Sequence, residues 1–159
     1  MTDKDIIDIS KANSLPARGD DLMRIIARFE YALKESDYGK SGNNGEVEVD
    51  WDKFANKALK ADFLTKVRNE RIAPTILANP ASKQIIEGTS LAWKDAALPT
   101  NVQDLMGAVR RIRNNLVHGG KSGDKDSDRN DALVSEAIEV LLEALRADGA
   151  VRNMFEGKW

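Results

Sequence analysis

The sequence predicts an all-α fold, a helical bundle of four main helices with short accessory helices. Apolar residues recur at three- and four-residue intervals in four separate segments, which is the period of a helix with one buried face. Residues that favour helix ends or turns separate these segments. No internal repeat is found, and the one alternation of apolar and polar residues is too short to predict a sheet. We therefore expect one domain over residues 1–159, with residues 1–19 and 150–159 peripheral to it.

The first main helix is predicted over residues 21–36, with Asp20 as its N-cap. The preceding SKANSLPARG contains Pro, Gly and Asn, which indicate a loop. Glu30 lies at the edge of the apolar face, where a carboxylate is usually solvated but could instead reach an arginine of the central helix. The apolar face itself consists of Leu22, Ile25, Ile26, Phe29 and Leu33.

The second helical region is predicted from Trp51 to about Ile72. Its apolar residues keep helical spacing, and Pro74 ends or bends it because proline lacks the backbone N–H that a helix interior needs. Residues 39–50 before it are rich in Gly and Asn. They end in a short alternation of valine and polar residues, which permits a brief extended piece but does not predict a sheet.

A short helix is predicted between Asn79 and Gly88. Asparagine as the cap, proline at the first helical position and glycine past the end form a typical helix-bounding pattern. Leu91 and Trp93 follow, and we expect them to pack in the connection before Pro99.

The central helix is predicted within residues 100–121, TNVQDLMGAVRRIRNNLVHGGK. Thr100 and Gln103 fit a capping box at its start, and Gly119 and Gly120 fit a left-handed C-cap at its end. The polar residues of the segment project away from the core, because the apolar ones follow helical spacing along one stripe. This stripe consists of Val102, Leu105, Val109, Ile112 and Leu116.

The last main helix is predicted from about Asp128 to Ala147, with Gly149 ending it. The tail that follows contains Phe155 and Trp159 and is apolar enough to dock on another surface. The apolar residues of the helix are Leu133, Ala137, Ile138, Leu141, Leu142 and Leu145.

The composition excludes several classes of site. The chain has no cysteine, which rules out disulfides and cysteine-ligated metals, and one histidine, which rules out a multi-histidine metal centre within one subunit. We expect no metal and no cofactor. No apolar run approaches the roughly 20 residues of a membrane span, and the N-terminus lacks a signal-peptide pattern. The expected location is therefore cytoplasmic, with no membrane partner.

Positive charge is concentrated on the central helix, although the chain has 24 basic and 26 acidic residues and a net charge of −2. Residues 101–121 hold four basic residues and one acidic residue, a local net charge of +3. This distribution argues against a broad nonspecific DNA-binding surface and favours a small phosphate-binding focus. The four basic residues are Arg110, Arg111, Arg113 and Lys121.

The end of the central helix resembles the R-x(4–6)-H signature of the HEPN superfamily, in which a histidine follows an arginine after a few residues. The matching residues are Arg113 and His118 within RNNLVHGGK, with a polar residue, Asn114, directly after the arginine. The resemblance covers this one helix, and the all-α layout expected for the rest of the chain is consistent with it.

The resemblance implies a metal-independent endoribonuclease that cleaves RNA by 2′-hydroxyl transesterification, acting as a toxin or phage-defence effector. It also implies a homodimer with a composite active site, and an antitoxin or regulatory protein as a partner. By position, His118 would be the acid–base group, Arg113 would hold the scissile phosphate, and Asn114 would orient these groups or bind the phosphate. Glu30 would support the site from the first helix. Further contacts to RNA would come from Arg110, Arg111, Asn115 and Lys121.

The residue types suit this chemistry. Histidine exchanges protons near neutral pH, and the planar guanidinium of arginine matches a phosphate and stays charged. Residues five apart differ by about 140° around a helix axis, whereas Arg111 and His118, seven apart, differ by about 20°. Either Arg113, the expected family arginine, reaches round toward a partner subunit, or Arg111 shares its work.

Each of these residues also has an ordinary structural interpretation. A histidine at a helix end complements the helix dipole, arginines flank many solvated helix faces, and asparagines cap helices. Two alternatives to the nuclease stay open: a non-catalytic module that binds nucleotide or RNA, and an adaptor bundle whose basic helix contacts an acidic protein. A phosphate-binding loop and a Ser-His-Asp hydrolase are not indicated, because neither the glycine–lysine spacing nor a nucleophile elbow is found.

Overall fold

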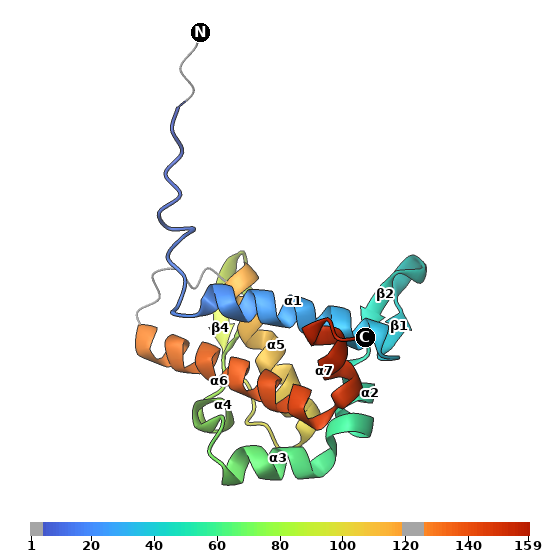
Figure 1. The fold of residues 1–159 in the computed structure, drawn as a ribbon. Helices are drawn as coiled ribbons and strands as arrows, with labels where there is room; N and C mark the ends of the chain where they lie inside the picture. Colours follow the sequence, from blue (N-terminus) through green and yellow to red (C-terminus); the bar gives the residue numbers. More distant parts are fainter. Residues whose placement is uncertain (1–4, 119–125) are drawn as a thin grey trace.

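The computed structural model describes residues 5–118 and 126–159. Its body is built around α1 (Gly19–Glu35), α5 (Val102–His118) and α6 (Ser127–Ala147), which pack against one another (Figure 1). The shorter helices α3 (Lys60–Asn69) and α4 (Pro74–Ala78) cover one end of this body. The largest fully buried side chains include Phe29, Leu33, Leu105, Val109, Ile138 and Leu141.

The buried faces of the long helices are those that the apolar spacing predicts. Every residue of the predicted stripe on α5, from Val102 to Leu116, is buried. On α1 and α6 the same holds except for Ile25 and Leu142, which are partly buried against the core. Removing such side chains from water stabilises the fold by about 1.5–3 kcal/mol each.

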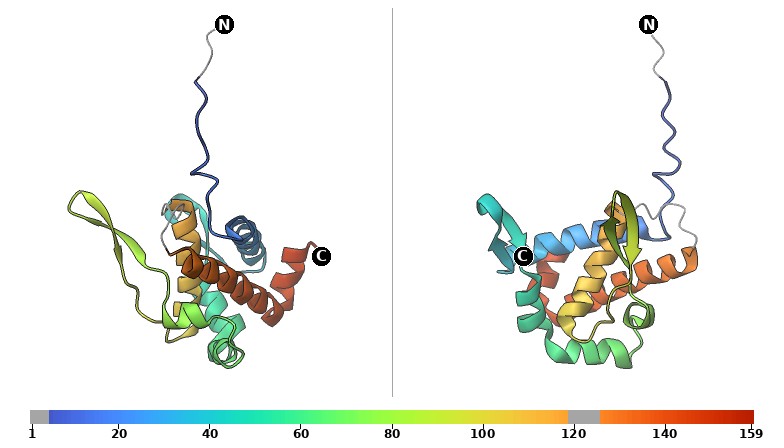
Figure 2. Two further views of the ribbon diagram at one scale, coloured as in Figure 1. Left: turned by 90° about the vertical axis from the view of Figure 1, so that its left-hand side faces the viewer. Right: turned by 180° about the vertical axis from the view of Figure 1, so that it is seen from behind.

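The prediction of an all-α bundle of four main helices is wrong, because two β-hairpins interrupt the helices. β1 (Gly39–Ser41) pairs antiparallel with β2 (Val47–Val49) around a short helical turn, η1 (Asn43–Gly45). β3 (Lys83–Glu87) pairs antiparallel with β4 (Ser90–Lys94). Both hairpins project from the helical body, and β3–β4 extends furthest from it in the left view of Figure 2.

β3 lies within the stretch from Asn79 to Gly88 for which a short helix is predicted, so that prediction is wrong. Gly88 has a φ of +64°, and with Thr89 it forms a two-residue turn. A positive φ suits glycine in a hairpin turn and at a helix end alike, and the pairing of Glu87 with Ser90 on either side makes Gly88 a hairpin turn residue. Ile85 and Ile86 are β-branched, which favours the strand.

The second helical region is less regular than predicted. After α2 (Trp51–Phe54) the chain widens into η2 (Ala55–Leu59), which has the π-helix pattern, before α3 begins. Lys60 stands at this junction with φ +63° and ψ 178°, a conformation that favours glycine. Pro74 opens α4 at its first turn instead of ending one long helix.

The C-terminal residues form α7 (Gly149–Glu156), which packs on α1 and on α6. Val151 is fully buried, and the Arg28 guanidinium donates to the carbonyls of Met154 and Phe155 at 3.1 and 3.0 Å. The last carbonyls of a helix lack donors within it, so the arginine completes their hydrogen bonding. Part of segment 150–159, which is expected to be peripheral, therefore belongs to the packed body.

Candidate functional site

Most of the candidate residues lie on α5, whose start is fixed by a reciprocal cap. Asn101 Oδ1 accepts a hydrogen bond from the backbone N–H of Asp104 at 2.7 Å. The Asp104 carboxylate accepts from the backbone N–H and the hydroxyl of Thr100 at 3.2 and 3.1 Å. The capping interaction therefore uses Asn101 and Asp104, one residue later than the predicted Thr100–Gln103 pair.

A groove lies between α5 and the start of β3, and it is termed here the α5–β3 groove. Its volume is about 480 Å³. Among the lining residues that the structure describes, three are basic, none is acidic, and the rest provide amide groups or glycine. Such a lining suits an anion that accepts several hydrogen bonds. The lining residues are Lys83, Gln84, Gly107, Arg110, Arg111, Asn114 and Asn115.

Two hydrogen bonds from α5 hold the segment before β3 against the helix. Asn115 is 6 % exposed and donates from Nδ2 to the Ser82 carbonyl at 3.0 Å. Arg111 Nη1 donates to the Ala81 carbonyl at 3.4 Å. Burial lowers the pKa of the Arg111 guanidinium, and nearby Asp104 acts in the opposite direction. Asn115 and Arg111, which are predicted to contact RNA, therefore also hold one wall of the groove in place.

Arg110 lies over the indole ring of Trp51, with 5.3 Å from its Cζ to the ring centroid. Its Nε donates to the Met106 carbonyl at 3.4 Å. Burial is the main cause that lowers the pKa of this guanidinium, while Asp52 raises it and Arg113 lowers it further. A guanidinium stays charged under such shifts, and one packed on an aromatic face is held in place for an anion.

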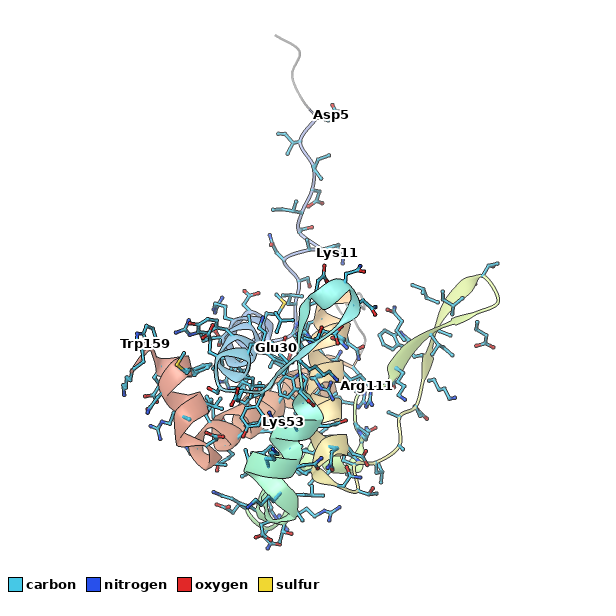
Figure 3. All side chains as sticks on the ribbon, turned by 90° about the vertical axis from the view of Figure 1, so that its right-hand side faces the viewer. Asp5, Lys11, Glu30, Lys53, Arg111 and Trp159 are labelled. Atoms are coloured by element: carbon cyan, nitrogen blue, oxygen red, sulfur yellow. The ribbon has the colours of Figure 1, made fainter. Side chains whose placement is uncertain are left out.

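Arg113 faces α1 and does not line the groove. Its Nη1 forms an ion pair with Glu30 Oε1 at 2.8 Å, and its Nε donates to Asn114 Oδ1 at 2.9 Å. The side chains of Arg113 and Glu30 are 26 % and 24 % exposed, so the pair is partly shielded from water. The contact between Glu30 and an arginine of the central helix is thus present. In Figure 3 Glu30 lies on the α1 side, while Arg111 lies toward the β3–β4 hairpin.

His118 is the last residue of α5, and its side chain lies outside the described part of the structure. Lys121 also lies outside the described residues. Helix periodicity places position 118 about 20° from Arg111 and about 40° from Asn114 around the axis of α5. Position 118 therefore continues the line of groove residues, whereas Arg113 is about 140° away.

Lys83 and Gln84 line the groove but are not predicted as site residues. They fall in the stretch for which a helix is expected. The segments KQIIE and SLAWK on either side of a Gly-Thr pair are a signal of a hairpin. That signal identifies the strands, although it does not tell which surface the hairpin lies against.

Residues 5–118 and 126–159 contain neither a membrane-spanning helix nor a cluster of metal ligands. None of the helices described there is long and apolar enough to cross a membrane. No group of three or more His, Cys, Asp or Glu side chains among these residues could hold a metal ion.

Comparisons of the chain with protein-family models, with curated proteins and with solved structures find no match.

Proposed function

We propose that the protein binds RNA in the α5–β3 groove and cleaves it as a metal-independent endoribonuclease of the HEPN type. The observation that carries the proposal is the groove itself. Lys83, Arg110 and Arg111 gather on the side of α5 where helix periodicity places position 118. Three cations in a lining whose described residues include no carboxylate favour a phosphodiester. A histidine at the end of the same side adds a group that exchanges protons near neutral pH.

In this proposal the RNA supplies its own nucleophile. The 2′-hydroxyl oxygen attacks the adjacent phosphorus, and the bond from phosphorus to the 5′-oxygen of the next nucleotide breaks. The products are a 2′,3′-cyclic phosphate and a 5′-hydroxyl. His118 moves the proton between these oxygens, and the guanidinium groups stabilise the charge that develops on the phosphoryl oxygens.

In this proposal Arg110 and Arg111, not Arg113, hold the phosphate. Arg110 and Arg111 line the groove, while Arg113 is engaged by Glu30 at 2.8 Å. Arg113 joins the reaction only if it leaves Glu30 or reaches the site of a second subunit. The resemblance to HEPN proteins alone supports a homodimer, an antitoxin or regulatory partner, and a cytoplasmic role as a toxin or phage-defence effector.

The Glu30–Arg113 pair favours a second candidate function, RNA binding without cleavage. If that pair persists in the RNA complex, the family arginine never reaches a phosphate. The groove would then bind the strand and leave it intact.

Cleavage of single-stranded RNA in the presence of EDTA tests the proposal. Wild-type protein is compared with His118→Ala, Arg111→Ala and Arg113→Ala, with Arg152→Ala on α7 as a matched control and circular dichroism to verify folding. We expect wild type and the control to leave 2′,3′-cyclic ends. His118→Ala should lose about 100-fold or more in rate, the contribution typical of an acid–base group.

The arginine variants assign the phosphate ligand. A larger loss in Arg111→Ala than in Arg113→Ala supports the groove assignment, and the reverse supports Arg113. Binding without cleavage by wild type supports the second candidate. Cleavage that survives in His118→Ala contradicts the proposed chemistry.

A further inference from the structure

We propose that Trp93 is a stacking platform for an unpaired base of the RNA strand whose phosphates bind in the α5–β3 groove. The inference rests on the proposed RNA binding and narrows its substrate class to single-stranded RNA. It does not depend on whether the bound strand is cleaved.

The register of the β3–β4 hairpin places Trp93 beside the groove. Gln84 on β3 pairs directly with Trp93 on β4. Directly opposite side chains lie on the same face of an antiparallel pair, with their Cβ atoms about 5 Å apart. Gln84 is a lining residue of the groove. The indole of Trp93 therefore lies at the groove's edge, on the face that Gln84 shares.

Trp93 is accessible from solvent, although it is expected to pack in a connection. Its exposed fraction is 44 %. The next pair on the same face, Ile86 opposite Leu91, is 74 % and 70 % exposed. These residues form an apolar strip that begins beside the groove and continues outward along the β3–β4 hairpin. The hairpin projects from the helical body (Figure 2).

The adjoining chemistries favour an unpaired nucleobase as the occupant of this strip. A strand bound by its phosphates at Lys83, Arg110 and Arg111 has its bases free to lie on a neighbouring surface. Aromatic side chains hold such bases by stacking, whatever their sequence, because every base has a π-face. In an RNA duplex the base faces are covered by their neighbours, so a stacking platform selects unpaired strands. Docking of a second protein chain would explain the apolar strip but not the cations beside it.

Binding of an uncleavable oligonucleotide tests the inference. The probe is a fluorescently labelled single-stranded RNA with 2′-O-methyl groups throughout, which has no 2′-hydroxyl to attack, and its binding is followed by anisotropy. Trp93→Ala should weaken binding about ten-fold, within the range that loss of one stacked base produces. Trp93→Phe should retain most of the affinity, because a ring remains. The affinity for a duplex of the same length should not change.

Trp159→Ala is the matched control, because this tryptophan is 83 % exposed and lies on the opposite side of the molecule from the hairpin (Figure 3). It should bind the probe as wild type does.

Three results overturn the inference. The first is a wild type that does not bind the single strand, and the second is a Trp93→Ala variant that binds it as tightly as wild type does. The third result is a loss of affinity in Trp93→Ala that is equal for the single strand and the duplex. Light scattering of wild type and Trp93→Ala tests the alternative, in which a second protein chain covers the strip. If Trp93→Ala changes the oligomeric state of the protein but leaves its RNA affinity unchanged, the strip binds a second copy of the chain, and the stacking inference is overturned. Wild type that binds through Trp93 but cleaves no RNA removes the proposed ribonuclease and leaves the stacking platform standing.

Discussion

Asn114 and Asn115 are adjacent in the sequence but lie about 100° apart around α5, so their surroundings differ. Asn115 is buried and donates to the Ser82 carbonyl, while Asn114 is exposed and accepts from Arg113. Both line the groove. One asparagine therefore joins the segment before the hairpin to the helix, and the other is an exposed part of the groove lining.

This difference predicts unequal effects of the two alanine substitutions. Asn115→Ala removes the donor and leaves a shielded carbonyl without its partner, which should cost about 1–3 kcal/mol in the free energy of unfolding. Asn114→Ala, the matched control, should change it by less than about 0.5 kcal/mol. Urea denaturation followed by circular dichroism measures both. Equal losses would mean that the bond to Ser82 does not stabilise the fold.

The ion pair between Glu30 and Arg113 is only partly predictable from the sequence. The periodicity of α1 correctly places Glu30 beside the apolar face, within reach of a neighbouring helix. Which arginine it meets depends on how α1 and α5 cross, and neither helix encodes that crossing by itself. The same limit applies to Lys83 and Gln84, whose place in the groove depends on where a hairpin lies.

Among the elements, the long helices are predictable from apolar periodicity and the hairpins are not. The stripe on α5 repeats over several turns, so a few ambiguous residues do not change the predicted face. The paired strands have three or five residues each, too few for an alternation to stand out. Asn-Pro and Gly around β3 fit a helix boundary as well as a turn, and it is the antiparallel pairing of β3 with β4 that separates the two.

The junction between η2 and α3 yields a prediction at the same scale. Lys60 adopts φ +63° and ψ 178°, a region that costs a residue with a side chain about 1–3 kcal/mol. Lys60→Gly should relieve this strain, whereas Lys60→Ala keeps it. We expect the glycine variant to be more stable than the alanine variant by about 1 kcal/mol, after the greater entropy of glycine in the unfolded chain is deducted. Thermal or urea unfolding of the two variants measures the difference, and a more stable alanine variant would contradict the strain.

For the whole molecule, the distribution of charge matters more than its total. The chain carries a net charge of −2, so it does not attract RNA as a general polycation does. The groove gathers Lys83, Arg110 and Arg111, and no acidic residue lines it within residues 5–118 and 126–159. Binding through such a small focus should depend on salt only moderately.

The predicted salt dependence follows from these three cations. Neutralising three phosphates of a single strand gives a slope of about −2 in a plot of log Kobs against log salt concentration, since each contributes about −0.7. Arg111→Ala should make the slope shallower by about 0.7, whereas Trp93→Ala should weaken binding without altering it. Anisotropy titrations between about 50 and 200 mM salt measure the slope. A slope near −6 would indicate a much larger basic surface than the groove.

The two walls of the α5–β3 groove are anchored differently. α5 is embedded in the core along its full apolar stripe, whereas the hairpin is tied to α5 near its base by the bonds from Asn115 and Arg111. A force on the hairpin tip would therefore tilt the hairpin about the stretch around Ser82, where it is tied to α5. We therefore expect a tilt of the hairpin to change the width of the groove's mouth more than it changes the packing of the core.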